Sequence, residues 1–195
     1  MTCTRPNGSL VPDPGMAYQS WLPDAAIAAP PPDPEVLARR AVARMMLRAV
    51  DMGAFPEPAS ADPDSLGYVG WNTWLWVENP SPTTWGPMSM SVSEGGYSVT
   101  ATANVSHVVW DMGNGETVTC GTGTAWDPRL VRNEPSPDCG YMYERDGEYQ
   151  VTATSHWEVD WAGIGETGTI ELELSDTADF RIAEVQVVNI ADPNG

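Results

Sequence analysis

Lysine is absent from this chain of 195 residues, and all nine of its basic residues are arginines. The absence excludes a Walker A phosphate loop, whose lysine contacts the nucleotide phosphates, and any chemistry through a lysine Schiff base. The 27 acidic residues give a formal net charge of -18. Because nucleic acids and anionic lipids are bound by neutralising their phosphates, we expect neither as a partner.

The sequence also lacks a long apolar run. No segment approaches the roughly 20 apolar residues that a membrane-spanning helix needs, and the first residues lack the charged and apolar regions of a signal peptide. We therefore expect no membrane insertion of these residues. Hydrophobic residues make up 42% of the chain, which is enough to bury a core.

Cysteine is scarce, with three residues in the chain. Cys120 and Cys139 flank an irregular loop, and closing a loop of this length by a disulfide contributes about 3 kcal/mol in the chain-entropy model. Two free thiols or half of a metal site are the alternatives, although a zinc site needs about four ligands and the chain has only two histidines. A disulfide predicts an extracytoplasmic compartment. Cys3 is left over, so it is either unpaired, paired with another chain, or paired with a cysteine that this sequence does not contain.

Proline content and periodicity divide the chain into parts. The expected order is an irregular proline-rich arm (1–33), an amphipathic helix (34–52), a linker that begins at Gly53 (53–67), a β-domain (68–190) and a tail (191–195).

Asp33 is the expected N-cap of the helix, and Pro34 suits its first position. The expected apolar stripe consists of Val36, Ala43, Met46, Leu47 and Val50. The helix also holds four of the nine arginines, Arg39, Arg40, Arg44 and Arg48. Three interpretations stay open: docking of the helix on its own domain, docking of a partner protein, and binding at a membrane surface, which the missing aromatic anchors disfavour.

From residue 68 onward, apolar and polar residues alternate with the period of half-buried strands. Strands are expected at 88–93, 97–105, 149–161, 169–175 and 184–188, with a hairpin turn at 94–96. The long segment 149–161 is the expected centre of a sheet, and Trp110 and Trp157 are expected in the interior. About seven short strands without a helix among them predict an antiparallel β-sandwich.

The segment "WDMGNG" at 110–115 resembles the "WDFGDG" signature of PKD (polycystic kidney disease) domains. In those domains a tyrosine, a glycine turn and a "Y-x-V" strand follow, as they do here. The matching positions are Trp110, Asp111, Gly113, Asn114, Gly115, Tyr143 and Tyr149. The resemblance covers about residues 70–189 and implies an immunoglobulin-like sandwich. Met112 and Asn114 depart from the signature, and the loop before the tyrosine is expanded and framed by the cysteine pair.

With "WNTWLWV" at 71–77 and the segment around Trp85, this variant is similar to a group of secreted or membrane-anchored actinobacterial proteins of unknown function. Some of those are labelled ATP/GTP-binding, which the lack of lysine argues against here. The resemblance implies no catalytic residue and no cofactor, because PKD domains are spacers and interaction modules.

Two clusters are candidates for binding. Asp111, Asn114 and Glu116 could supply oxygens to calcium, but Asp and Asn in a glycine turn usually hydrogen-bond their own backbone. Tryptophans could form a platform for glycans, although core packing is the commoner role. The candidates are Trp71, Trp74, Trp76, Trp85 and Trp126, of which Trp126 is the one expected at the surface.

The sequence shows no convincing catalytic constellation. His107 and His156 are expected on strand faces opposite the core, and the alternating carboxylates of 158–160 and 171–173 are expected on solvated faces. We expect a non-enzymatic, extracytoplasmic β-sandwich module for protein interaction or assembly at the cell envelope. The alternative is glycan or cell-wall binding through exposed tryptophans. A glycoside hydrolase would need two acidic side chains roughly 5 to 9.5 Å apart in a cleft.

Overall fold

A computed structural model describes residues 30–186, and the elements below belong to the compact unit Pro31–Gly195. Most of the predicted arm, the predicted tail, Cys3 and the end of the expected strand 184–188 lie outside the described residues. The elements are α1 (Pro34–Met45), β1 (Asp51–Phe55), β2 (Gly67–Tyr68), β3 (Asn72–Glu78), β4 (Met88–Glu94), β5 (Tyr97–Asp111), β6 (Thr117–Cys120), β7 (Gly140–Met142), β8 (Gly147–Gly163) and β9 (Glu166–Ala183).

The strands form a long sheet and a small sheet, as the predicted sandwich requires. The long sheet has the order β2-β9-β8-β5-β4, with β6 paired to the second half of β5, and the small sheet has the order β1-β3-β7. All pairs are antiparallel except β2 with β9. β8 lies between β5 and β9, which confirms that the segment 149–161 is central.

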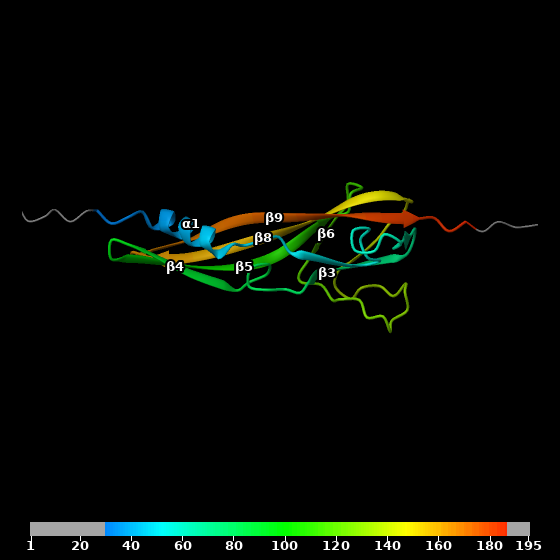
Figure 1. Ribbon diagram of the computed structural model, residues 1–195, viewed down its shortest axis with the longest axis horizontal. Coiled ribbons are helices and arrows are strands. Elements are labelled where there is room, and N and C mark those ends of the chain that lie inside the picture. The colour runs from blue at the N-terminus through cyan, green and yellow to red at the C-terminus, as the bar shows by residue number, and fades with distance from the viewer. Residues whose placement is uncertain (1–29, 187–195) are drawn as a thin grey trace, which may run out of the picture. The chain divides into compact units, whose positions relative to one another are not determined.

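Two different layers cover the inner face of the long sheet. α1 packs over the half formed by β4 and the beginning of β5, and β3 lies over the other half (Figure 1). Alternate residues of β8, and of β5 on either side of a bulge at Ser106, point into this core, and Trp110 and Trp157 are 0% and 1% exposed, as predicted. The result is a sandwich at one half of the sheet and a helix-on-sheet layer at the other.

The helix is shorter than predicted. Asp33 caps it as expected, because its Oδ1 accepts hydrogen bonds from the backbone N–H groups of Glu35 (2.9 Å) and Val36 (3.4 Å). α1 then ends at Met45, and Met46 is left-handed with φ 54°. The helix begins at Pro34 as predicted, but its predicted end at residue 52 and the predicted start of the linker at residue 53 are wrong: Gly53 lies inside β1, and the β-structure begins at residue 51.

The predicted apolar stripe is also wrong. The buried residues of α1 are Leu37, Ala38, Ala41 and Met45, whereas Val36 is 44% exposed and Met46 73% exposed. Small alanines at the centre of the buried face let the helix approach the sheet closely. The prediction assumed that the helical period continues to residue 50, but the helix ends at Met45. Val50 is buried, but it belongs to the segment that connects α1 to β1 and not to the helix.

The three longest strands of the long sheet are longer than predicted. β5, β8 and β9 have 15, 17 and 18 residues, and β9 ends at Ala183, so residues 184–186 are not part of a strand. Polar residues 175–177 of β9 pair with residues 152–154 of β8. Because this stretch lacks clear apolar alternation, the sequence pattern does not reveal that β9 continues through it.

Candidate ligand-binding groove

The outer face of the small sheet carries an unusual number of aromatic side chains. In the β1–β3 register, Gly53 is opposite Trp76, and Phe55 is opposite Trp74. Residues opposite each other in the register, and residues two positions apart in a strand, point to the same face of a sheet. These four residues therefore share one face. Leu75 points the other way, into the core, where it is 0% exposed.

Trp76 lies against the backbone of β1. A Cβ atom on Gly53 would come within 2.0 Å of the Trp76 Nε1, so glycine is what lets the indole occupy this position. The indole Nε1 donates a hydrogen bond to Glu78 Oε2 at 2.6 Å. Both the ring and its carboxylate partner are thereby held in place on the outer face.

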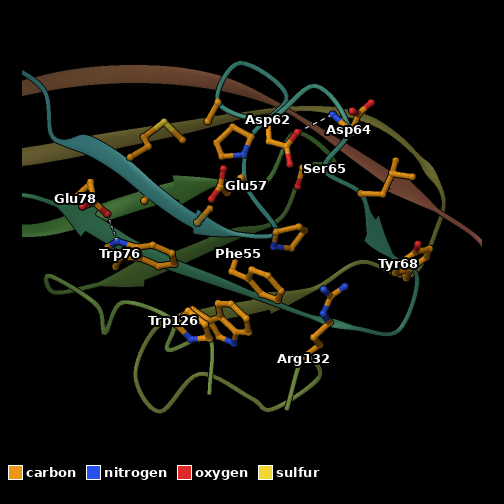
Figure 2. A pocket seen from close by; sticks show the side chains of 18 residues that line it. Phe55, Glu57, Asp62, Asp64, Ser65, Tyr68, Trp76, Glu78, Trp126 and Arg132 are labelled. Carbon is orange, nitrogen blue, oxygen red and sulfur yellow. Dashed lines mark hydrogen bonds between the residues drawn. The ribbon is translucent and has the colours of Figure 1, made fainter. Parts of the chain in front are cut away.

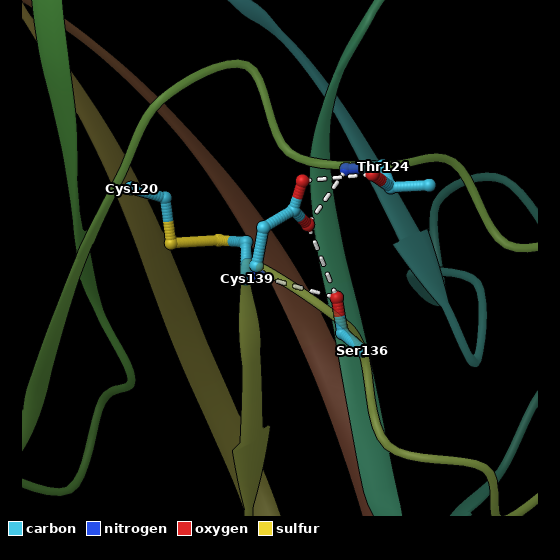
Figure 3. The surroundings of a disulfide bond; sticks show 5 residues. Cys120, Thr124, Ser136 and Cys139 are labelled. Carbon is cyan, nitrogen blue, oxygen red and sulfur yellow. Dashed lines mark hydrogen bonds between the residues drawn. A yellow bond between two sulfur atoms is a disulfide. The ribbon is translucent and has the colours of Figure 1, made fainter.

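The disulfide between Cys120 and Cys139 is formed as predicted, with the two Cα atoms 5.7 Å apart (Figure 3). It closes the loop 121–138, whose ends attach to β3. The Leu75 N–H donates to the carbonyl of Cys139 (3.0 Å), and the Val77 N–H donates to the carbonyl of Thr122 (2.7 Å). The loop is therefore anchored along β3 on both sides of the disulfide.

Side chains inside this loop hold it together. The Asp138 carboxylate accepts hydrogen bonds from the Thr124 N–H (3.0 Å) and hydroxyl (2.7 Å). Further along, the Asp127 carboxylate accepts hydrogen bonds from the Arg129 side chain and backbone, which lower the Asp127 pKa. The loop covers Trp74, whose Nε1 donates to the carbonyl of Glu134 at 2.6 Å.

Trp126 projects from the loop onto the end of β1. Its ring stacks on that of Phe55, with ring centroids 3.6 Å apart and an angle of 6° between the planes. Trp126 is predicted at the surface, but it is half-buried in this stack. No acceptor within residues 30–186 reaches its buried indole nitrogen.

A groove of about 690 Å³ opens between these aromatic rings and the segment 56–66. Figure 2 shows Glu57 and Asp62 across the groove from Phe55 and Trp126. The segment is attached to the long sheet by a hydrogen bond from the Ala59 N–H to the Asp179 carbonyl (2.8 Å). The charged residues that line the groove are Glu57, Asp62, Asp64, Glu78 and Arg132.

The predicted tryptophan platform is only partly assembled. Trp76 and Trp126 line the groove, and Trp71, 39% exposed, lies beside Tyr68 in a smaller adjoining pocket. Trp74 is buried, and the carbonyl of Trp85 accepts a hydrogen bond from β5, on the long sheet.

Phe55 and Tyr68 complete the aromatic lining of the groove, and neither is among the predicted binding residues. Phe55 falls in the predicted linker, and Tyr68 falls at its boundary. Their only sequence signal is an aromatic residue on each side of a proline-rich segment.

The turn at 111–116 is held by its own side chains. Asp111 Oδ1 accepts a hydrogen bond from the Gly113 N–H (2.9 Å), and Asn114 Oδ1 accepts one from the Glu116 N–H (3.1 Å). Gly113 has φ 75°, and a Cβ there would come within 2.7 Å of the Gln150 carbonyl oxygen. Within the part of the chain that the structure describes, no three His, Cys, Asp or Glu residues are placed to hold a metal ion.

Tyr143 joins this turn to the core. Its hydroxyl donates to the carbonyl of Met112 at 3.1 Å, and the residue is 1% exposed. Burial raises the pKa of the Tyr143 phenol, and the nearby Tyr141, Tyr149 and Asp111 raise it further. The signature residues therefore lock the turn onto the sandwich.

His107 and His156 meet on the outer face of the long sheet, opposite the core as predicted. Their rings stack with centroids 4.4 Å apart, beside a bulge that places Ser106 next to them. The Ser106 hydroxyl is 3.0 Å from His107 Nδ1, but it also donates to the His156 carbonyl (3.2 Å), so its proton is engaged by the backbone. A one-residue bulge sets this register, which the sequence pattern could not reveal.

Comparisons with protein-family models, curated proteins and solved structures find no match. The fold and site themselves define the class: a mostly β protein with sandwich-like layers, one helix, a disulfide-closed loop and an aromatic groove. Across residues 30–186, no helix is both long and apolar enough to cross a membrane.

Proposed function

We propose that this protein is a non-enzymatic, extracytoplasmic module that binds a carbohydrate in the groove of the small sheet. The observation that carries the proposal is the stacked pair Phe55–Trp126 beside Trp76, on one wall of an open groove whose other wall carries carboxylates. An aromatic surface and polar groups that converge on one opening are the two features that a ligand site needs.

The chemistry of a pyranose fits this arrangement. Its axial C–H groups form an apolar face that can pack on an aromatic ring, and its hydroxyls are donors to carboxylates. Glu78 is already oriented by Trp76, so its second oxygen needs little ordering on binding. Glu57 and Asp62 lie on the opposite wall, where they can accept from hydroxyls at the edge of the sugar.

The disulfide supports the proposed compartment, because disulfides persist in oxidising environments outside the cytoplasm. The finer assignment of the sandwich to the PKD type is part of this proposal. It is supported by the buried Trp110, the capped turn after it and the hydrogen bond from Tyr143 to that turn. The helix-covered half of the long sheet would be an extension of such a domain.

Protein docking through the apolar face of α1 has less support than carbohydrate binding. Leu37, Ala38 and Ala41 are all 0% exposed, because that face packs on the sheet of the same chain. Only the outward-facing side of α1 is left for a partner.

Tryptophan fluorescence tests the proposal directly. The protein is titrated with soluble polymers of neutral hexoses, of N-acetylhexosamines and of uronic acids, and saturable quenching or enhancement is expected with at least one polymer below millimolar concentration. Trp126→Ala is expected to weaken binding about tenfold, the loss of roughly 1.4 kcal/mol. Tyr97→Ala, which removes an exposed aromatic residue on the β4–β5 hairpin, is the matched control and should change affinity less than twofold.

Two results contradict the proposal. Absence of a spectral change with every polymer at millimolar sugar removes the binding function. Release of new reducing ends from a bound polymer, lost on Glu57→Gln or Glu78→Gln, would replace a binding module by a hydrolase.

A further inference from the structure

β4 forms an open edge of the long sheet. It pairs with β5 along its whole length, from Met88 opposite Ala103 to Glu94 opposite Tyr97. Among residues 30–186, no strand and no backbone hydrogen bond covers its other edge. Such an edge presents unpaired N–H and C=O groups at every second residue and can accept another strand.

The two long edges of this sheet differ in their protection. Between residues 166 and 179, β9 carries five acidic side chains, and charges of this kind discourage the addition of a strand. By contrast, β4 carries neither a charge nor a proline from Met88 to Ser93. The edge of β4 is therefore the one that the sequence leaves open to pairing.

A row of arginines runs beside this edge. The Arg40 guanidinium forms an ion pair with Glu94 at the end of β4, and the Arg48 N–H donates to the Thr83 carbonyl, which precedes the start of β4. The segment 40–48 thus runs antiparallel to β4. Arg44 is one turn after Arg40 on the same side of α1, which places it between these two anchor points.

Two arginines of this row are available to a ligand. Arg44 and Arg48 are exposed, and neither forms an ion pair with any residue between 30 and 186. Arg39, on the other side of α1, is engaged in an ion pair with Glu35 at 2.6 Å. In a chain with a net charge of -18, the row is a local basic strip beside the open edge of β4.

We propose that the β4 edge binds an extended, acidic segment of a partner protein by strand addition. The added backbone would pair with the free N–H and C=O groups of β4. Its alternate side chains would point to the α1 side, where Met88 and Met90 lie partly buried and where Asp or Glu would meet Arg44. The intervening side chains would lie beside the outward serines of β4.

The charge pattern argues against a second copy of this chain as the occupant. Antiparallel pairing of β4 with its own copy has a two-fold axis perpendicular to the sheet, so both α1 helices would lie on the same side. The two arginine rows would then face each other across the junction.

Fluorescence anisotropy tests the proposal, with a labelled eight-residue peptide of alternating glutamate and valine as the probe. We expect saturable binding to the full chain at low salt, and weakening as salt increases. Arg44→Glu should weaken binding about tenfold. Arg39→Glu, the matched control on the other side of α1, should change it less than twofold. Trp126→Ala should leave it unchanged, because the groove is a different site.

Two further peptides make the result specific. A peptide of alternating lysine and valine should fail to bind. So should the glutamate peptide in which every second backbone nitrogen, the ones that would pair with β4, is methylated. Binding of either as tightly as the probe, no binding of the probe at 1 mM, or equal losses in the two arginine variants would overturn the proposal. So would a concentration-dependent dimer in sedimentation that the probe does not dissociate, because a second copy would then occupy the edge.

Discussion

Removal of the disulfide should lower both the free energy of unfolding and the affinity of the groove for carbohydrate. In the chain-entropy model, a loop closed by cysteines 19 positions apart contributes about 3 kcal/mol to the free energy of unfolding. Cys120 and Cys139 are 6% and 2% exposed, so alanine is the replacement that buries no new polar group. We expect the double variant Cys120→Ala/Cys139→Ala to lose about this amount in urea unfolding at neutral pH.

The effect on binding follows from the anchors of the loop. The hydrogen bonds from Leu75 and Val77 of β3 lie on either side of the disulfide, and Trp126 lies between them in the chain. Without the covalent tie, the loop is expected to hold Trp126 less firmly on Phe55, a stack worth about 1 kcal/mol. Carbohydrate affinity, measured by calorimetry, should fall several-fold.

The control for the double variant is the wild-type protein treated with a reductant, which should show the same two losses. Alkylation without reductant, followed by mass measurement, should leave Cys120 and Cys139 unmodified. A loss of stability below 1 kcal/mol in the double variant, or an unchanged sugar affinity, would refute the role given to the loop.

Three other substitutions test separate parts of the account. Leu37→Ala should cost about 2 to 5 kcal/mol of unfolding free energy in urea titration, because the side chain is fully buried, whereas the exposed Val36→Ala should cost less than about 0.5 kcal/mol; equal costs would contradict the observed helix face. Gly53→Ala should displace Trp76, lower the melting temperature and weaken sugar binding, since its Cβ would overlap the indole; an unchanged affinity would remove Trp76 from the site. Burial raises the pKa of Tyr143 above its ordinary value of 10.0, so the neutral phenol stabilises the folded state fully below pH 10. Above pH 10 the free energy of unfolding should fall by about 1.4 kcal/mol per pH unit. Tyr143→Phe should reduce this slope in unfolding curves measured between pH 9 and 11.5, and an unaltered slope would contradict the assignment.

Local pattern and short-range chemistry made much of the long sheet predictable. The strict alternation from Tyr97 to Val105 and from Tyr149 to Trp161 assigns each side chain to a face, and burial follows that assignment except at Tyr97, which is exposed at the start of β5. The two cysteines around an irregular loop predicted the disulfide correctly. These features depend on neighbours in the sequence or on a single covalent pair.

The groove depends on contacts that no local pattern encodes. Phe55 and Trp126 stack although one belongs to a strand hidden in a predicted linker and the other to the disulfide loop. β1 has only five residues, of which Gly53 has low strand propensity, so its pairing with β3 is what forms it. The buried face of α1 was mispredicted because the helix was expected to continue past residue 46. Its actual end at Met45 is set by the left-handed Met46, and no glycine or proline marks that position in the sequence.

The central claim is that Trp76 and Trp126 bind a carbohydrate on the outer face of the small sheet. The most direct measurement follows the indole N–H resonances of the nine tryptophans by NMR during titration with the polymer that binds best. The account predicts large shifts for Trp76 and Trp126 and none for the buried Trp110 and Trp157. Saturable binding that leaves the Trp76 and Trp126 resonances unmoved would contradict it.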